Sequence, residues 1–385
     1  MTKGKTGLIF TLIENGRVYA PEPLGITSIL LLGERIVAVG AIDMKALAGA
    51  GMECQVIDAA GCVVLPGLID PHQHLIGAGG EHGFNSRLPE IPLEQIVQCG
   101  ITTAVGLLGT DTVTRDPRCL YAKVQQLNQD GLTAYMYTGG FELPPRTVTT
   151  SVVDDLVFID PIIGTGEIAL SDSRWIDPPL EELAHVVAQT YLGGMMAGKA
   201  GVTHFHIGSG RNRLGLLRDL LNSYEIPAEA IYVTHITRSM ELLREAVELA
   251  KGGAFVDMDS VEQNIPECLR AYQQQGGDLK RLTVSSDAQT PGGSPQKFLE
   301  ALVTSLQDGV VPLETLLPCF TTNAADILKL KRKGRIQENH DADVVILRDG
   351  SWEVVHVFAN GQHFVRDGRL IRQSQQQRLL QEGNV

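Results

Sequence analysis

The chain has 385 residues, is 43% hydrophobic and 20% charged, and contains 41 glycines. This length allows one large domain with a smaller one, and the composition excludes a disordered or fibrous protein. The net charge of −13, without any basic stripe, argues against a nucleic-acid partner.

The cysteines and the beginning of the chain indicate a cellular compartment. Six cysteines are scattered without a CxxC pair, as expected of free thiols in a reducing environment. The apolar run at residues 7–13 ends at Glu14, which makes it too short for a membrane span, and it lacks a small-residue cleavage site. We therefore expect a cytoplasmic protein that has no contact with a membrane.

Both ends of the chain predict short β-strands. Residues 1–66 contain runs rich in branched residues, such as 8–13 and 28–32, which are separated by turn signals. The tail from residue 338 repeats this pattern, with Asn360-Gly361 as one of its hairpin turns. We expect residues 1–66 and 338–385 to form one discontinuous domain, a small β-sandwich.

Between these ends, residues 67–337 alternate between strand and helix patterns. Strands are expected at 62–69, 102–106, 134–138, 162–170, 202–207, 231–236, 254–258 and 282–286. Helices are expected at 93–98, 117–128, 180–197, 214–223, 240–251, 262–275 and 295–305. This alternation predicts an α/β fold, a (β/α)8 TIM barrel, with its active site at the C-terminal ends of the strands. A doubly wound open sheet is the alternative, but no Gly-x-Gly-x-x-Gly sequence follows an early strand.

The segment Asp70-Pro71-His72-Gln73-His74 directly follows an apolar run. Side chains two residues apart on a strand point to the same face, so these two histidines can bind one divalent cation. Three more candidate ligands each end a later strand: His206, His235 and Asp287. Together they predict a metallohydrolase site. His204 shares a face with His206, so spacing alone does not choose between them.

Seven ordered segments carry a family resemblance: Gly67–Glu81, Val105–Asp111, Pro145–Thr147, Ser171–Arg174, Phe205–Gly208, Thr234–Arg238 and Ser285–Asp287. In the tail, Lys333–Ile336 and Asp341–Val344 extend it. Over nearly its whole length the chain resembles the amidohydrolase superfamily, and within it the isoaspartyl (β-aspartyl) dipeptidases. A lone HxH recurs widely, whereas this ordered set is far more specific.

The resemblance implies two divalent metal ions. It assigns His72 and His74 to the more buried ion, and His206 and His235 to the more exposed one. Asp287 would contact metal and the attacking water. Nitrogen and oxygen ligands of this kind favour zinc.

The position that bridges the two metals departs from the better-known family members, which carry a carboxylated lysine on the fourth strand. Alignment back from Ser171–Arg174, through Gly164-Thr165-Gly166, places Glu167 there. Both groups end in a carboxylate that can bridge two cations. The resemblance also favours His206 over His204 as the metal ligand.

Four residues match substrate contacts of the family. Glu81 matches a carboxylate that holds the free α-amino group of the substrate, and Thr110 lies in the same pocket. Arg174 and Arg238 match guanidinium groups that bind substrate carboxylates, for which a planar fork of donors is suited. The alternative is that they are solvated surface side chains.

Two further positions depart from the family. A tyrosine that polarises the scissile carbonyl is replaced by Phe141, which has no hydroxyl, and Tyr135 and Tyr137 are the nearest tyrosines that might replace it. A serine that helps to hold a substrate carboxylate has no clear counterpart after Asp287, where Thr290 is the nearest substitute. These departures concern substrate specificity rather than the metal ligands.

The resemblance therefore implies hydrolysis of a β-aspartyl dipeptide, with Asp287 as general base and acid. The first alternative is a related amidohydrolase, such as a cyclic-amide hydrolase, a deacetylase or a deaminase. The second is a non-catalytic scaffold, although such proteins usually lose metal ligands. The resemblance also implies a homo-oligomer such as an octamer. The sequence contains no Gly-x-Ser-x-Gly segment, the turn that carries the serine nucleophile of many hydrolases, so serine catalysis is not expected.

Overall fold

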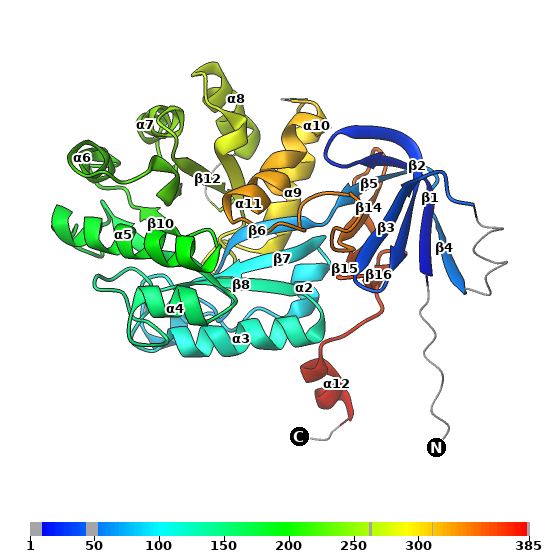
Figure 1. Cartoon of the computed structure of the whole chain (residues 1–385), viewed down its shortest axis with the longest axis horizontal. Helices are drawn as coiled ribbons and strands as arrows, with labels where there is room; N and C mark the ends of the chain where they lie inside the picture. Colours follow the sequence, from blue (N-terminus) through cyan, green and yellow to red (C-terminus); the bar gives the residue numbers. More distant parts are fainter. Residues whose placement is uncertain (1–9, 44–52, 262–263, 310, 383–385) are drawn as a thin grey trace.

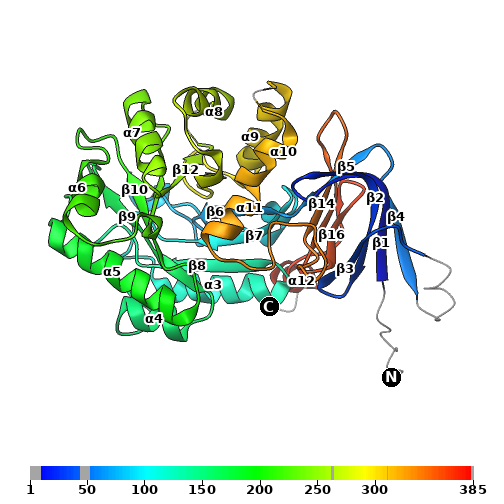
Figure 2. The same cartoon turned by 45° about the horizontal axis from the view of Figure 1, so that its top comes forward.

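The computed structural model describes residues 10–43, 53–261, 264–309 and 311–382. These residues form a barrel surrounded by helices and a second sheet at one side of it, which belongs to the smaller domain (Figures 1 and 2). The predicted strand 8–13 begins outside the described residues, and so do the first two residues of the predicted helix 262–275.

The barrel is a parallel sheet of eight strands within the described ranges, and its strands follow one another in chain order. They are β6 (Leu68–Gln73), β7 (Ile101–Gly106), β8 (Thr133–Thr138), β9 (Ile162–Leu170), β10 (Val202–Ile207), β11 (Ile231–Thr234), β12 (Phe255–Asp259) and β13 (Leu282–Ser285). The side chains of these strands are almost entirely buried, as expected where helices cover a parallel sheet. The predicted (β/α)8 fold is confirmed.

The barrel closes between its first and last strands. Gln73 at the end of β6 forms a parallel bridge with Ala288, which follows β13. The buried carboxylate of Asp70 accepts hydrogen bonds from the backbone amide of Ser286 (3.1 Å) and from the Gln73 side chain (2.7 Å). Burial raises the pKa of Asp70 to about 6, although these hydrogen bonds oppose the shift. The closure therefore lies directly below the predicted metal ligands.

Helices cover the outside of the barrel (Figure 2). They are α2 (Leu93–Val97), α3 (Pro117–Asp130), α4 (Val152–Phe158), α5 (Leu180–Ala197), α6 (Gly215–Ser223), α7 (Met240–Lys251), α8 (Ile265–Gln274) and α9 (Pro295–Gln307). Serine side chains cap the first turns of α4, α7 and α9, namely Ser151, Ser239 and Ser294. The helix α4 is not among the helices predicted from the sequence.

Shorter helices complete the chain: α10 (Leu313–Leu316), α11 (Thr322–Ile327), α12 (Gln375–Glu382), and 3₁₀ turns at Phe84–Ser86, Ala228–Ala230, Leu279–Arg281 and Leu317–Phe320. Among the described residues, no helix has the length and apolar character needed to cross a membrane.

The second sheet combines both ends of the chain. Its strands are β1 (Phe10–Tyr19), β2 (Pro23–Leu32), β3 (Arg35–Gly40), β4 (Cys54–Asp58), β5 (Cys62–Pro66), β14 (Val344–Arg348), β15 (Val354–Ala359), β16 (Gln362–Arg366) and β17 (Arg369–Leu370). The antiparallel pairing of β5 with β14 joins the two ends. The sheet surrounds its own apolar core, to which both ends contribute, for example Ile29 and Phe358.

One predicted strand is wrong in its extent. Residues 62–69 do not form a single strand, because β5 belongs to the small sheet and β6 to the barrel. The chain changes sheets at Gly67, where a Cβ atom would collide with the side chain of Thr102. A continuous apolar run does not reveal where the chain passes from one sheet to the other, because the residues before and after Gly67 are equally buried.

A buried lysine joins the barrel to the small sheet. The ammonium group of Lys333 donates to the hydroxyl of Thr133 at the start of β8 (2.6 Å) and to Asn360 (3.0 Å). It also pairs with Asp341 (2.9 Å) and Asp343 (2.7 Å). A buried charge is tolerated only when it is paired in this way.

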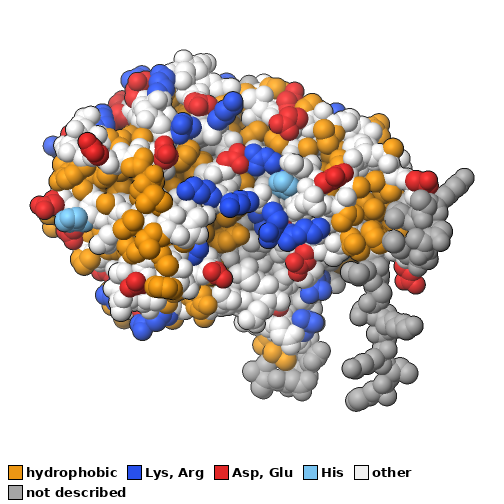
Figure 3. Space-filling view, in the orientation of Figure 1, with side chains coloured by type: hydrophobic (Ala, Val, Ile, Leu, Met, Phe, Trp, Pro, Cys, Tyr) orange, Lys and Arg blue, Asp and Glu red, His pale blue; other side chains and the backbone are white. Residues whose placement is uncertain are grey.

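Basic side chains gather near this junction, over the middle of the face shown in Figure 3. Tyr135, Lys199 and Lys333 line a cavity of about 250 Å³ there. Tyr135 lies near the beginning of its barrel strand. The cavity is therefore at the end of the barrel opposite to the predicted ligands.

Candidate metal centre

The structure brings the six predicted metal ligands together at the C-terminal ends of the barrel strands. Each is at most 8% exposed. They are His72 in β6, His74 directly after it, Glu167 in β9, His206 in β10, His235 directly after β11, and Asp287 two residues after β13. We call these six residues the histidine–carboxylate cluster. Parallel strands end at the same side of a barrel, which explains why residues far apart in the sequence meet here.

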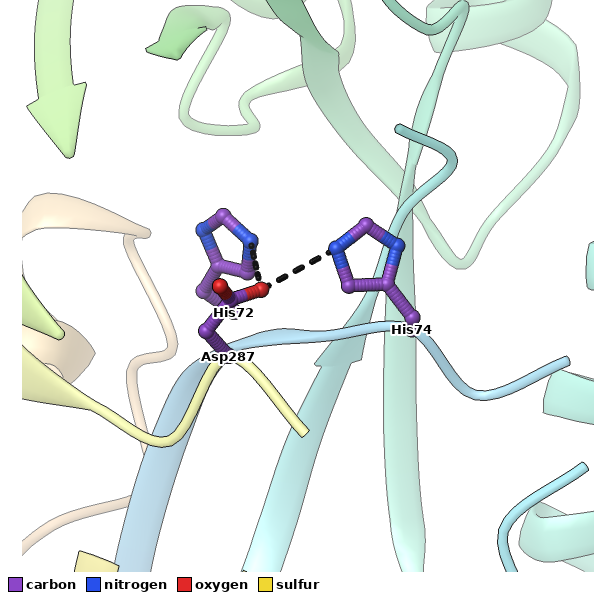
Figure 4. A group of neighbouring side chains, drawn as sticks. All are labelled: His72, His74 and Asp287. Atoms are coloured by element: carbon purple, nitrogen blue, oxygen red, sulfur yellow. Dashed lines mark ion pairs between the residues drawn. The ribbon is translucent and has the colours of Figure 1, made fainter. Parts of the chain in front are cut away.

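The first part of the cluster is formed by His72, His74 and Asp287, which are shown in Figure 4. Oδ1 of Asp287 lies 3.2 Å from Nε2 of His72 and 3.1 Å from Nε2 of His74. All three side chains point to one spot and offer one ligand atom each, so they could hold a metal ion. The arrangement follows from the alternation of side chains along β6.

Glu167 lies between this group and the other two histidines. Its Oε1 is 3.6 Å from Nε2 of His74, and its Oε2 is 3.7 Å from Nε2 of His72. The same Oε2 is 3.2 Å from Nδ1 of His206 and 3.6 Å from Nε2 of His235. One carboxylate therefore faces four imidazoles, as a group that bridges two cations must.

A bulge in β9 directs Glu167 to this position. Thr165 pairs with Thr203 on β10, whereas Ile168 pairs with Phe205. Gly166 and Glu167 therefore lie opposite a single residue of β10, which re-aims the side chain that follows the bulge. A Cβ atom on Gly166 would come within 2.6 Å of the backbone oxygen of that residue.

The single residue opposite the bulge is His204, which sequence reasoning placed deeper in the barrel without a role. It is fully buried, and its Nε2 lies 2.9 Å from Nδ1 of His72. Its ring stacks on Tyr137, with centroids 5.0 Å apart, and packs on Tyr232 at 4.6 Å. Because His204 contacts the far nitrogen of His72, it helps to orient that ring.

Two aspartates orient the other pair of histidines, and sequence reasoning missed both. Oδ2 of Asp259 lies 2.9 Å from Nδ1 of His235, so Nε2 of this ring is left to face Glu167. Oδ2 of Asp172 lies 3.0 Å from Nε2 of His206. The sequence indicated these two aspartates only in part: Asp259 ends a barrel strand, and Asp172 belongs to the Ser171–Arg174 segment that resembles the family.

The electrostatics of the cluster suit bound cations. Burial opposes charge on His235, yet Asp259 and Glu167 raise the pKa of His235 to about 10. Burial also disfavours charge on Asp287, but the imidazoles of His72 and His74 beside it hold the pKa of Asp287 below its usual range. Nε2 of His72 is buried and lacks a partner in hydrogen-bonding geometry among the described residues. Buried carboxylates beside an unpartnered imidazole nitrogen fit a divalent metal site.

The predicted substrate residues lie on loops beside the cluster. Oε1 of Glu81 accepts a hydrogen bond from the hydroxyl of Thr110 (2.9 Å) and lies 3.6 Å from Nη1 of Arg174. Arg238 donates to the backbone oxygen of Ile207 (2.7 Å). The structure therefore brings the amine-binding and carboxylate-binding candidates within reach of the same small space.

Arg174 is fixed from several sides. Its Nε and Nη2 donate to the two oxygens of Asp172 at 2.9 and 2.8 Å. Its guanidinium carbon lies 5.2 Å from the centroid of the Phe141 ring, within the range of a cation–π contact. The Phe141 ring in turn packs against His206, with centroids 4.5 Å apart. The phenylalanine therefore supports Arg174 rather than offering a hydrogen bond.

The candidates for a replacement hydroxyl are engaged elsewhere. The hydroxyl of Tyr137 donates to the backbone oxygen of Pro71 (3.5 Å), and Tyr135 lies at the opposite end of the barrel. The hydroxyl of Thr290 donates to the backbone oxygen of Asp287 (2.6 Å), which closes its own turn. None of the three therefore supplies the missing contact in this structure.

Comparison with known proteins agrees with this geometry. Residues 55–99 match the Amidohydrolase family. The crystal structure of a β-aspartyl dipeptidase from Fervidobacterium islandicum is 37% identical in sequence and superposes with a TM-score of 0.89 over 94% of this chain and 98% of that one. The same dipeptidase in complex with β-Asp-Leu superposes with a TM-score of 0.88 at 36% identity.

More distant relatives have other activities. An adenine deaminase from Carboxydothermus hydrogenoformans is 24% identical over 83% of this chain, which spans only 52% of that enzyme. An imidazolonepropionase from Brevibacillus brevis is 27% identical over 83% of this chain and 84% of its own length. Because the matched segment 55–99 contains the first two histidines, and the dipeptidase aligns over almost its full length, the chain belongs to the amidohydrolase superfamily of metal-dependent hydrolases.

Proposed function

We propose that this protein hydrolyses β-aspartyl dipeptides at a centre of two divalent metal ions, with zinc as the preferred metal. The observation that carries the proposal is the combination of the histidine–carboxylate cluster with Glu81, Arg174 and Arg238 beside it. A β-aspartyl dipeptide carries one ammonium group and two carboxylates around its amide bond. The three charged side chains are complementary to those groups.

Each member of the cluster has a distinct part in this proposal. His72 and His74 would hold one ion with Asp287, and His206 and His235 would hold the other. Glu167 would be shared between the two ions. A second side chain fixes the orientation of His72, His206 and His235, as is usual for metal-binding imidazoles.

The chemistry divides between the metals and the protein. Bound divalent ions would activate water and polarise the scissile carbonyl. Asp287 accepts the proton of the attacking water and delivers it to the departing amine. Its depressed pKa keeps this carboxylate ionised, which the first of these steps requires. Glu81 binds the substrate ammonium, while Arg174 and Arg238 bind its carboxylates.

Phe141 favours one alternative within the same superfamily. Loss of a hydroxyl donor at a carbonyl typically costs about 3 kcal/mol of transition-state stabilisation. A substrate that does not need this donor, such as a cyclic amide or an amino-heterocycle, would be affected less. The deaminase and imidazolonepropionase relatives show that such activities occur on related sequences.

The test is hydrolysis of β-Asp-Leu beside α-Asp-Leu by the zinc-loaded protein. We expect cleavage of the β-linked peptide alone, because the amine and the carboxylates of the α-linked peptide are spaced differently around the amide. The matched control is Asp287→Asn, which keeps the size of the side chain and removes its basicity. Cleavage of neither peptide by protein that holds two metal ions would reject the dipeptidase and favour the alternative amidohydrolase.

A further inference from the structure

Arg115 is a charged side chain that is almost completely buried and does not belong to the histidine–carboxylate cluster. It follows β7 and lies just before α3. Its Nε donates to the backbone oxygen of Ile76 (3.3 Å), and its Nη2 donates to those of Ala78 (2.8 Å) and Leu88 (3.1 Å). Its Nη1 donates to the backbone oxygen of Gly79 (3.4 Å) and to Asp111 (2.8 Å). Every N–H direction of the guanidinium is therefore used.

Four of these five acceptors belong to one loop, residues 76–88, which we call the glycine loop. Its two arms meet at two places. The amide of Leu88 donates to the backbone oxygen of Ala78 (2.9 Å), and Gly79 forms an antiparallel β-bridge with Arg87. Gly77 and Gly79 lie so close to the returning arm that a Cβ atom on either would collide with its backbone. The loop is therefore a closed, compact unit, with Arg115 bonded to both arms.

The glycine loop carries Glu81, and the following loop carries Thr110. The two loops touch directly through the hydrogen bond from Thr110 to Glu81 (2.9 Å). They are also joined through Asp111, whose carboxylate accepts from Arg115 and from the backbone amide of Thr114 (2.8 Å). One guanidinium thus connects both loops that form the amine-binding end of the site.

We propose that Arg115 is the positioning residue of the ammonium-binding subsite, because it holds the glycine loop in the shape that places Glu81 against Thr110 and Arg174. This inference rests on the proposed function in one respect, namely that Glu81 binds the substrate ammonium. The geometry of the loop does not depend on that function. Arg115 forms no hydrogen bond with the histidines of the cluster, so it acts through the two loops that position Glu81.

The physical reason is the number of backbone oxygens that depend on one side chain. Without the guanidinium, four loop carbonyls lose a charge-assisted hydrogen bond, and some must turn toward water. The loop then samples shapes in which Glu81 is displaced. The apparent affinity for the substrate falls in proportion to the fraction of molecules in which the loop holds Glu81 in its binding position. The metal ligands keep their places on the strands.

The test compares Arg115→Lys and Arg115→Met with Arg118→Met. Arg118 lies three residues further along, is 72% exposed and pairs only with Asp116 among the described residues, so it controls for loss of a nearby arginine. We expect KM for β-Asp-Leu to rise about 10-fold in Arg115→Lys and about 100-fold in Arg115→Met. We expect kcat and zinc content to stay close to the wild-type values, and Arg118→Met to change none of these quantities.

A double-mutant cycle with Glu81→Gln tests whether Arg115 acts through Glu81. If it does, the combined variant raises KM little more than Glu81→Gln alone, because the loop no longer carries the carboxylate that binds the ammonium group. Additive effects, or a fall in zinc content with Arg115→Lys, would show that Arg115 has only a general structural role.

Hydrogen exchange keeps the inference testable if β-Asp-Leu is not the substrate. Amides of residues 76–88 are expected to exchange faster in Arg115→Lys than in the wild type, while those of β10 and β11 stay unchanged. Faster exchange without dipeptidase activity in the wild type would reject the proposed substrate and retain the role of Arg115 in the loop. Unchanged exchange in the loop would overturn the inference itself.

Discussion

The histidine–carboxylate cluster and the substrate loops are built differently. Members of the cluster lie in barrel strands or within two residues of their ends, and each histidine at its centre is at most 4% exposed. Glu81, Thr110 and Arg174 lie on loops, and the side chain of Arg174 is 40% exposed. The cluster is held by the pairing of strands, whereas the loops are held by a few side chains that bond to backbone oxygens, Arg115 above all.

From this difference we expect that metal binding and substrate binding can be altered separately in this chain. A change in the cluster should alter metal affinity or the chemical step. A change in the loops should alter substrate affinity and leave the metals in place. The four changes that follow test this separation, beginning with the one of largest effect.

Asp287→Asn removes the group that is expected to take the proton of the attacking water. We expect kcat to fall about 10³-fold, the usual contribution of a general base. Steady-state kinetics with β-Asp-Leu measures the change, with the exposed Asp308→Asn as a matched control. If kcat falls less than about tenfold, Asp287 is not the base.

Asp259→Asn tests the support of the cluster. Asp259 fixes the ring of His235 through Nδ1 and leaves Nε2 to face Glu167, so its loss should weaken zinc binding by about 10- to 100-fold. Competition with a chelator measures this affinity, and the exposed Asp326→Asn serves as control. An affinity equal to that of the wild type would contradict the role of Asp259.

Glu81→Gln tests the loops. Removal of the charge that faces the substrate ammonium should raise KM for β-Asp-Leu by about 10- to 100-fold, without a change in zinc content. The N-acetylated peptide provides a matched control, because it lacks the ammonium and should be an equally poor substrate for both proteins. If Glu81→Gln loses zinc, the cluster and the loops are not separable.

Phe141 touches both regions and should give the smallest effect. Phe141→Leu removes the ring beside the guanidinium of Arg174, a contact that contributes about 0.5–1 kcal/mol at partly exposed sites. We expect KM to rise about 2- to 5-fold, and Phe141→Tyr to leave KM unchanged because it keeps the ring. Equal KM values for Phe141→Leu and the wild type would show that the ring does not position Arg174.

The sequence predicts the barrel well, because its strands and helices follow from local periodicity, whereas Glu167 and the choice of His206 came from the family resemblance. The strand 162–170 was predicted with its observed bounds, and His72 and His74 share a face because side chains alternate along a strand. The sequence did not reveal that residues 62–69 divide between two sheets. That division depends on pairing of β5 with β14, almost 300 residues away in the chain.

The residues that orient the metal ligands and hold the glycine loop were harder to predict. Asp259, His204 and Arg115 act through other residues, and the positions of Asp259 and His204 on barrel strands do not by themselves reveal which residues they contact. Their partners are distant in sequence and meet only in the folded barrel. The bulge at Gly166 and its effect on Glu167 follow only from the pairing with β10, which the sequence does not show.

The most direct test of the account is the metal content of three purified proteins by elemental analysis: the wild type, Glu167→Ala and Glu81→Ala. The account predicts about two divalent ions per chain in the wild type, as expected of a bridged pair, and the same in Glu81→Ala. It predicts one ion or fewer in Glu167→Ala, because the carboxylate between the four imidazoles is lost. Two ions retained in Glu167→Ala would contradict the bridging role of Glu167 and with it the proposed centre.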